Sequence, residues 1–145
     1  MRRRQRLIGE AEFSFYHVIC KAPDRTPGNF EFAFGEEEKA KMEELVLEME
    51  QTYMIRVLGY CHMSTHSHLI CMVERDAAKN LSGEELSERF CNHFKRKPQR
   101  MNCRSKALRR FRKNINDISV YGKVLQQRFA RSVSRRQSMF LNSFK

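Results

Sequence analysis

The sequence predicts an α+β domain built on an antiparallel sheet, and three observations predict it. The chain has 145 residues, enough for one compact domain over residues 1–145 that folds without a disulfide or a metal. Segments with the two-residue alternation of strands are interrupted by segments with the 3.6-residue spacing of helices. Two of the strand segments are separated only by Ser64 and Thr65, which favours a hairpin of antiparallel neighbours.

The first half of the chain contains a strand, a turn and a helix. Residues 13–21 alternate but are apolar on both faces, which is typical of a central strand. Pro23, Pro27 and Gly28 mark the turn that follows. Residues 36–53 are expected to be helical, because apolar side chains recur on one face and three glutamates stand at the N-terminal end.

The second half begins with strands at 54–63 and 66–74, followed by a helix at 82–94. Ser82 and Glu85 have the spacing of a capping box at the start of that helix. Residues 95–115 are strongly basic and are expected to be an extended arm, and residues 116–137 form a last long helix with one apolar stripe. This order predicts a ferredoxin-like antiparallel sheet that lacks its final strand, with helices on one face.

Charge divides the chain into two unequal parts. Residues 1–89 hold 12 basic and 16 acidic side chains, whereas residues 90–145 hold 16 basic side chains and only one acidic side chain. Such a basic block predicts a polyanionic partner, most often a nucleic acid, although a solvated face is the plain alternative. The expected contacts are Arg2, Arg3, Arg4, Lys95, Arg96, Lys97, Arg100, Arg109, Arg110, Arg112 and Lys113.

The cysteines and the N-terminal residues indicate the cellular compartment. Five cysteines form no CxxC pair, so we expect reduced and mostly buried thiols. The arginines after Met1 are followed by no apolar segment of a signal peptide, and no apolar run is long enough to cross a bilayer. The sequence therefore predicts a cytoplasmic protein without a membrane partner.

His66 and His68 are the sharpest candidates for chemistry. Alternation in a strand puts both imidazoles on one face, about 6.5–7 Å apart along the chain, where they could hold one divalent cation. A plain surface or packing role is the alternative, since two histidines at this spacing are common. Cys61 has the opposite parity, which argues against a Cys–His zinc cluster, and His17 is expected to be a core histidine.

Several segments resemble the REP-associated tyrosine transposases, a group of single-tyrosine HUH transposases. Tyr16-His17-Val18 is similar to the family's opening strand. The run from Val57 to Ile70, containing His66-Ser67-His68, is similar to its Y-x-x-M-x-N-H-x-H-L-L signature. Asp117-Ile118-Ser119 and the later Gln127-Arg128-Phe129 are similar to its C-terminal helix. These segments follow the family's order over most of the chain, which is more specific than the histidine pair.

The resemblance implies a fold, a substrate and a mechanism. The fold would be the ferredoxin-like HUH endonuclease type, working as a homodimer on hairpin-forming single-stranded DNA. His66 and His68 would hold Mg²⁺ or Mn²⁺, and Gln137 matches the position of the third ligand. A tyrosine of the C-terminal helix would attack the phosphodiester and form a covalent link, a case of metal-assisted nucleophilic catalysis in DNA transposition.

The sequence departs from this family at the nucleophile. Val133 stands at the tyrosine position and has no hydroxyl, and the only tyrosine in the predicted last helix is Tyr121. Tyr121 is either a displaced nucleophile or a core aromatic, because it falls on the apolar stripe where relatives carry phenylalanine. The chain ends at Lys145, where relatives usually continue, so we expect a shortened copy.

Three functions therefore stay open. The chain is an active transposase or single-strand endonuclease, a DNA-binding relic without cleavage, or a basic RNA- or ribosome-associated protein with a coincidental histidine pair.

Overall fold

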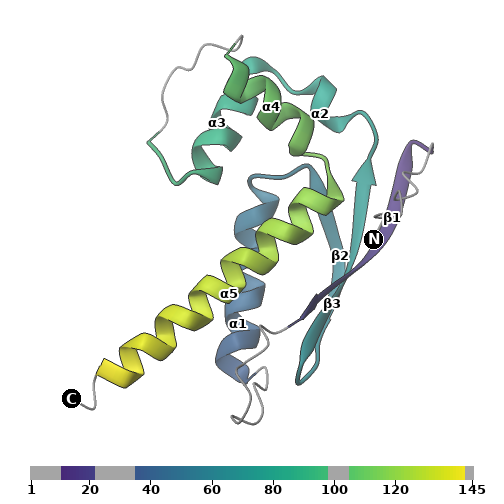
Figure 1. Ribbon diagram of the computed structural model, residues 1–145. Coiled ribbons are helices and arrows are strands. Elements are labelled where there is room, and N and C mark those ends of the chain that lie inside the picture. The colour runs from purple at the N-terminus through teal and green to yellow at the C-terminus, as the bar shows by residue number, and fades with distance from the viewer. Residues whose placement is uncertain (1–10, 22–34, 98–104, 143–145) are drawn as a thin grey trace, which may run out of the picture.

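The structure is a computed structural model that describes residues 11–21, 35–97 and 105–142, with the side chains of the last helix described as far as residue 134. Its elements run along the chain as shown in Figure 1. They are β1 (Phe13–Lys21), α1 (Glu36–Glu50), β2 (Ile55–His62), β3 (His66–Glu74), α2 (Ala77–Asn80), α3 (Gly83–His93), α4 (Lys106–Asn114) and α5 (Ile118–Asn142).

The described strands form one antiparallel sheet in the order β1-β3-β2. The prediction that β1 is a central strand is wrong, because β3 lies at the centre and β1 pairs along one edge only. Apolar side chains on the second face of β1 are instead exposed, and Phe15 is 64% accessible. The fold class is confirmed: helices pack on one face of an antiparallel sheet in a ferredoxin-like arrangement.

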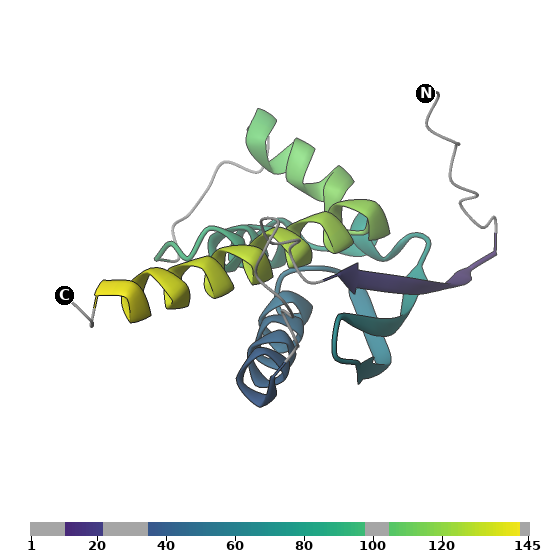
Figure 2. The same cartoon turned by 60° about the horizontal axis from the view of Figure 1, so that its bottom comes forward.

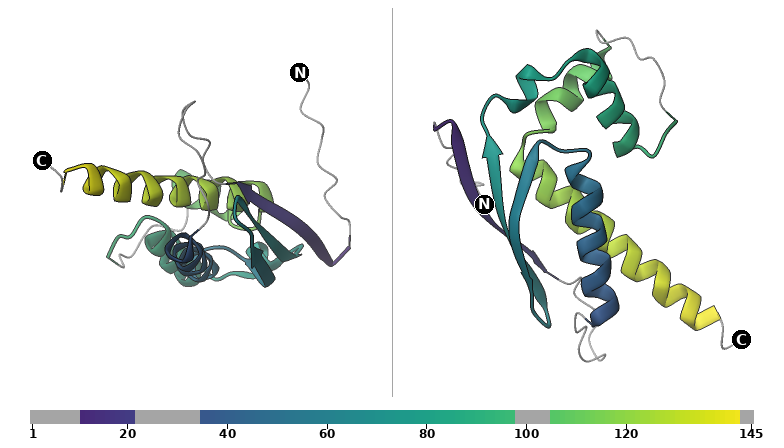
Figure 3. Two further views of the ribbon diagram at one scale, coloured as in Figure 1. Left: turned by 90° about the horizontal axis from the view of Figure 1, so that it is seen from below. Right: turned by 180° about the vertical axis from the view of Figure 1, so that it is seen from behind.

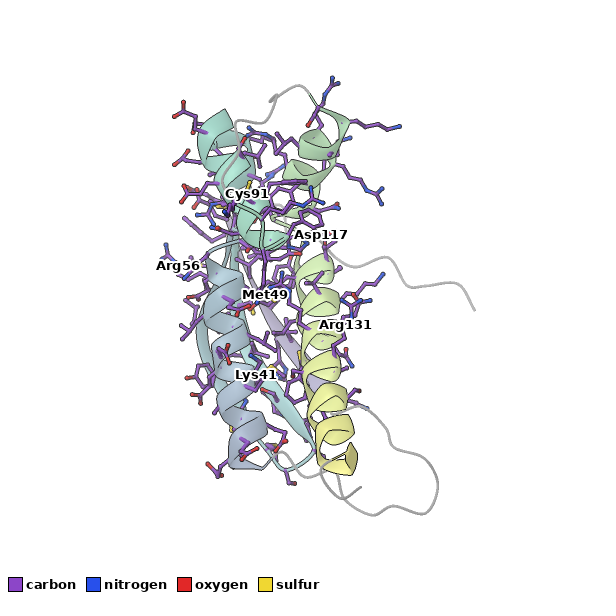
Figure 4. The ribbon with its side chains drawn as sticks, turned by 90° about the vertical axis from the view of Figure 1, so that its left-hand side faces the viewer. Lys41, Met49, Arg56, Cys91, Asp117 and Arg131 are labelled. Carbon is purple, nitrogen blue, oxygen red and sulfur yellow. The ribbon has the colours of Figure 1, made fainter. Side chains whose placement is uncertain are left out.

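The main core lies between the sheet and the helices α1 and α5. Figure 4 shows these two helices side by side in front of the sheet, with Met49 of α1 between them. Leu69 and Cys71 of the central strand meet Phe129 of α5 in one buried cluster with the apolar side of α1. We call the sheet face that is turned away from α1 and α5 the outer face.

The last helix is longer than predicted. It begins at Ile118 and runs to Asn142, and its C-terminal end projects beyond the sheet (Figures 1 and 2). Asp117 stands at its start (Figure 4), where its carboxylate accepts hydrogen bonds from the backbone amides of Ser119 and Val120. The aspartate of the Asp-Ile-Ser segment therefore caps a helix N-terminus, which is a structural role. Within the described residues, no helix is both long and apolar enough to cross a membrane.

The prediction of an extended arm over residues 95–115 is wrong for residues 106–114, which form α4. Leu108, Phe111 and Ile115 are buried against Leu86 and Phe90 of α3 in a second, smaller apolar cluster. The helices α2, α3 and α4 group beyond one end of the sheet (Figures 1 and 3). Most residues of α4 are basic, but its apolar residues are spaced so that they fall on one face of the helix.

The end of α3 holds a residue in an unfavourable backbone conformation. The amide of Arg96 donates to the carbonyl of Cys91 over 2.9 Å, and the amide of Lys95 donates to the carbonyl of Asn92 over 3.1 Å. These two bonds define a Schellman motif, which requires a left-handed residue at the position that Lys95 occupies. Lys95 accordingly has a φ of 50°, the only positive value at a non-glycine residue in the described ranges.

We expect Lys95→Gly to raise the free energy of unfolding by about 1 kcal/mol, because glycine adopts this conformation without steric cost. Urea denaturation measures the change. Lys95→Ala is the matched control: it also removes the ion pair of Lys95 with Glu48 at 3.3 Å but keeps the β-carbon. If alanine stabilises as much as glycine, the backbone conformation is not the cause.

Candidate functional site

The outer face of the sheet brings three imidazoles together. His66 and His68 of β3 lie on it, because the alternate residues Ser67 and Leu69 are buried on the helix side. The prediction that His66 and His68 share one face of a central strand is therefore confirmed. His17 of β1 lies on the same face, since its neighbours Tyr16 and Val18 pack against the core. The sequence interpretation of His17 as a core histidine is wrong.

His68 is the centre of this group. Its Nδ1 lies 2.7 Å from Nε2 of His17, and the two rings are stacked with centroids 4.9 Å apart. The ring of His66 meets that of His68 edge-on, with centroids 4.7 Å apart. We call His17, His66 and His68 the histidine cluster.

The tight hairpin between β2 and β3 brings a cysteine to this face. The amide of Met63 donates to the carbonyl of His66 across the two-residue turn, and the same register pairs Cys61 with His68. Directly paired residues share a face, so Cys61 is exposed on the outer face. The sequence interpretation that Cys61 has the wrong parity for this cluster is therefore wrong. A bulge further along β2 leaves Leu58 without a partner on β3, but it lies beyond Cys61 as counted from the turn.

The same register turns His62 toward the helices. His62 pairs with Ser67 across the hairpin, and its Nδ1 lies 2.6 Å from the buried Ser67 hydroxyl. Its Nε2 lies 3.7 Å from the carboxylate of Glu43 on α1. Burial lowers the pKa of His62, and the carboxylate of Glu43 partly offsets this effect. Ser67 thus serves as a hydrogen-bond partner on the core side.

The surroundings of His68 favour its neutral imidazole. Desolvation lowers the pKa of His68, and the neighbouring rings of His66 and His17 lower it further. The neutral form carries the lone pair that binds a metal. The Thr65 hydroxyl lies 2.9 Å from Nδ1 of His66, a contact that would leave Nε2 of His66 free when Nδ1 carries the proton.

The donor atoms on this face suit Mg²⁺ poorly. Among the described residues, those that pair with or follow His66 and His68 on the outer face carry no carboxylate: they are Lys21, Ile19, Ile70, Cys61 and Met63. Magnesium prefers oxygen ligands, whereas imidazole and thiolate suit softer transition metals. The backbone of Gln137, the expected third ligand, belongs to α5, and its side chain lies outside the described part. Among the described residues, no group of three or more His, Cys, Asp or Glu side chains is arranged so that it could hold a metal ion.

The candidate nucleophile positions are on the other side of the sheet. Val133 is 5% exposed and Tyr121 is 0% exposed. Both are residues of α5 whose side chains pack in the main core. Burial raises the pKa of Tyr121 far above its usual range, and Tyr53 meets its ring edge-on at 5.6 Å. Among the described residues the Tyr121 hydroxyl has no hydrogen-bond partner. This placement is that of a core aromatic.

The expected DNA contacts are dispersed. Lys95, Arg96 and Lys97 are exposed after α3, and Arg109, Arg110 and Lys113 are exposed along α4. A cavity of about 450 Å³ opens beside α4, and its lining includes four basic side chains. These are Arg75, Lys79, Arg112 and Lys113. The positions Arg2, Arg3, Arg4 and Arg100 lie outside the described residues.

Two residues near this basic surface have structural roles. The guanidinium of Arg112 donates to the carbonyls of Ala78 and Leu81 over 2.8 and 2.9 Å. These bonds give partners to backbone carbonyls at the C-terminal end of α2. His93 is half-buried between Tyr53 and Phe111, and its pKa is lowered by burial and by the nearby Arg128.

Comparison with known proteins gives no relative. No family model matches the chain, and neither a curated protein nor a solved structure is similar enough to count as a match. The resemblance to the HUH transposases therefore stays a prediction from the sequence. Sequence reasoning did not place His17 and Cys61 beside His66 and His68 on the outer face. The two-residue turn at Ser64 and Thr65 is the signal that could have placed Cys61, because it pairs Cys61 with His68.

Proposed function

We propose that this chain is a DNA-binding protein of the single-tyrosine HUH transposase type that binds hairpin-forming single-stranded DNA without forming a tyrosine adduct. The observation that carries the proposal is the pair His66 and His68, which share the outer face of the central strand. An HUH motif on a central strand of a ferredoxin-like sheet is what the sequence resemblance implies. The opposite placement of Val133 and Tyr121 supports the absence of an adduct.

Two kinds of surface support binding of unpaired nucleotides. The exposed basic side chains of α4, together with those after α3, supply charge that attracts phosphates. Phe13 and Phe15 are exposed on β1, on the same outer face as the histidine cluster. Aromatic rings at such positions offer platforms on which unpaired bases of any sequence can stack.

A covalent-adduct assay tests this proposal. Full-length protein is mixed with labelled hairpin-containing single-stranded DNA, with Mn²⁺ or with EDTA, and separated on a denaturing gel. Binding is measured in parallel on native gels against RNA of the same sequence. We expect hairpin DNA to bind more tightly than the matched RNA, with no covalent band. A metal-dependent covalent band, or tighter binding of RNA, would overturn the proposal.

We expect the double variant Arg110→Ala/Lys113→Ala to bind hairpin DNA more weakly at every sequence tested. The slope of log affinity against log salt concentration should become shallower by about 0.7 for each phosphate that the variant no longer neutralises. Fluorescence anisotropy over a salt series measures this slope. The matched control is Lys39→Ala/Lys41→Ala, which removes two charges from the acidic helix α1. Equal effects of both variants would mean that net charge alone governs binding.

A further inference from the structure

We infer that the cavity beside α4 binds one unpaired nucleotide of the DNA, with the phosphate on its basic side chains and the base against the ring of Tyr16. This inference rests on the proposed function and names the part of the DNA that a second site recognises. The cavity lies on the helix side of the sheet, because Tyr16 and Val73 of its lining pack on that side. It is therefore separate from the histidine cluster on the outer face.

The cavity has the size and the walls of a small-ligand site. It lies between the sheet, α2, α4 and the N-terminal end of α5 (Figure 1). Its volume is about 450 Å³, within the range of about 300–1,000 Å³ that is usual for such sites. Tyr16, Val73, Ala78 and Ile118 supply an apolar wall. The planar base of a nucleotide can pack against this wall, and the aromatic ring offers a surface for stacking.

The charges of the lining favour a phosphate. Four cations line the cavity: Arg75, Lys79, Arg112 and Lys113. All of them except Arg112 are exposed, so they can reach a phosphate in solution. Among the described residues of the lining, only Asp117 is acidic, and its carboxylate accepts hydrogen bonds from the amides of Ser119 and Val120. The positive end of α5 therefore compensates the one negative charge at the cavity.

A second cavity continues from the first along the edge strand β1. It has a volume of about 550 Å³ and shares Tyr16, Ile118 and Ser119 with the first cavity. Its lining adds Gln126 and Gln127 of α5, whose amides can both donate to and accept from the edges of bases. Bases in a duplex are stacked and paired, so they cannot enter such cavities without leaving the helix. The two joined cavities therefore suit unpaired nucleotides that continue from a hairpin stem.

Fluorescence anisotropy with three DNA hairpins and the full-length protein tests this inference. The hairpins have the same stem and loop. One ends blunt, one continues as an unpaired tail of normal nucleotides, and one has a tail of equal length whose nucleotides lack the base. The two tailed hairpins have equal charge, so the ratio of their affinities isolates the contribution of the bases.

Two variants, each with a matched control, locate the site. Ser119→Trp narrows both cavities without a change of charge, and Ser134→Trp places the same side chain at an exposed position of the same helix. Lys79→Ala removes one cation of the lining. Its control is Lys39→Ala, because each lysine forms an ion pair with a carboxylate three residues earlier, at 2.6 Å for Lys79 and 2.7 Å for Lys39. Circular dichroism checks that each variant is folded.

We expect the native protein and Ser134→Trp to bind the normal tail at least about fivefold more tightly than the base-free tail. This ratio should fall to about one in Ser119→Trp, because the base can no longer enter. Lys79→Ala should weaken the binding of both tailed hairpins by a similar factor, and by more than Lys39→Ala does.

Three results would overturn the inference and leave the proposed function standing. Equal binding of the two tailed hairpins by the native protein would reduce the cavity to a general anion-binding surface. A preference for bases that survives in Ser119→Trp, or is lost equally in Ser134→Trp, would remove the base from this cavity. Equal effects of Lys79→Ala and Lys39→Ala would remove the phosphate from it. No binding of any hairpin would overturn the inference together with the proposed function.

Discussion

Replacement of Phe129 by alanine is expected to lower the free energy of unfolding by about 3–5 kcal/mol, the largest effect that we predict for a single residue. Phe129 is 0% exposed and lies in the main core, in the cluster that includes Leu69 and Cys71. Its removal leaves a cavity that the two helices and the sheet cannot close without disturbing the packing around it. Urea denaturation followed by circular dichroism measures the decrease.

Phe15→Ala is the matched control for this prediction. Phe15 is 64% exposed on the outer face, so the same truncation there should change stability by less than about 0.5 kcal/mol. Comparable decreases at both positions would contradict the assignment of the core to the helix side. That result would mean that the outer face is covered in solution.

Tyr121→Phe is expected to raise the free energy of unfolding by about 1–3 kcal/mol. The tyrosine hydroxyl is buried without a hydrogen-bond partner among the described residues, which costs the folded state the desolvation of a polar group. Phenylalanine keeps the ring and its edge-on contact with Tyr53. The same variant should bind hairpin DNA as the native protein does, because Tyr121 does not reach the outer face.

Tyr53→Phe is the matched control. Tyr53 is also buried and touches Tyr121, but its hydroxyl is not among the buried polar atoms that lack a partner. We therefore expect no gain in stability from Tyr53→Phe. A decrease in stability in Tyr121→Phe would contradict the prediction and would point to an internal water that bonds to this hydroxyl.

The hairpin and the histidine pair could be predicted from the sequence because their signals are local. The strand β3 runs from His66 to Glu74 as predicted, since its alternation continues without a break. The capping box of Ser82 and Glu85 forms as predicted, because both hydrogen bonds lie within one turn. Both hydrogen bonds depend on side chains within three residues of each other, which is the range that sequence patterns report best.

The order of the strands and the helix α4 could not be predicted, because they depend on distant partners. Apolar residues on both faces of β1 indicated a central strand, yet Phe13 and Phe15 remain exposed at an edge. The sequence did not indicate the helix α4, because most of its residues are basic. Its two buried residues, Leu108 and Phe111, form an apolar face only in contact with α3, which covers them.

The face on which Cys61 lies follows from the hairpin turn and not from counting residues along the sequence. A two-residue turn pairs residue 63 with residue 66, so an odd-numbered residue of β2 shares a face with an even-numbered residue of β3. The opposite parity of Cys61 and His68 was therefore the wrong criterion, although the turn itself was predicted. The bulge at Leu58 could not be placed in this way, because Gly59 gives only a general sign of it.

The bulge at Leu58 also governs how this chain should be compared with its evolutionary relatives. A relative whose second strand has no extra residue would lack a counterpart of Leu58, and its sequence must be given a one-residue gap there. An alignment that is anchored at the hairpin turn and lacks that gap would match Ile55 and Val57, which lie on the helix side, with residues of the outer face. Cys61 keeps its pairing with His68 whether or not Leu58 is present, so gain or loss of this one residue would leave the side chains of the outer face unchanged.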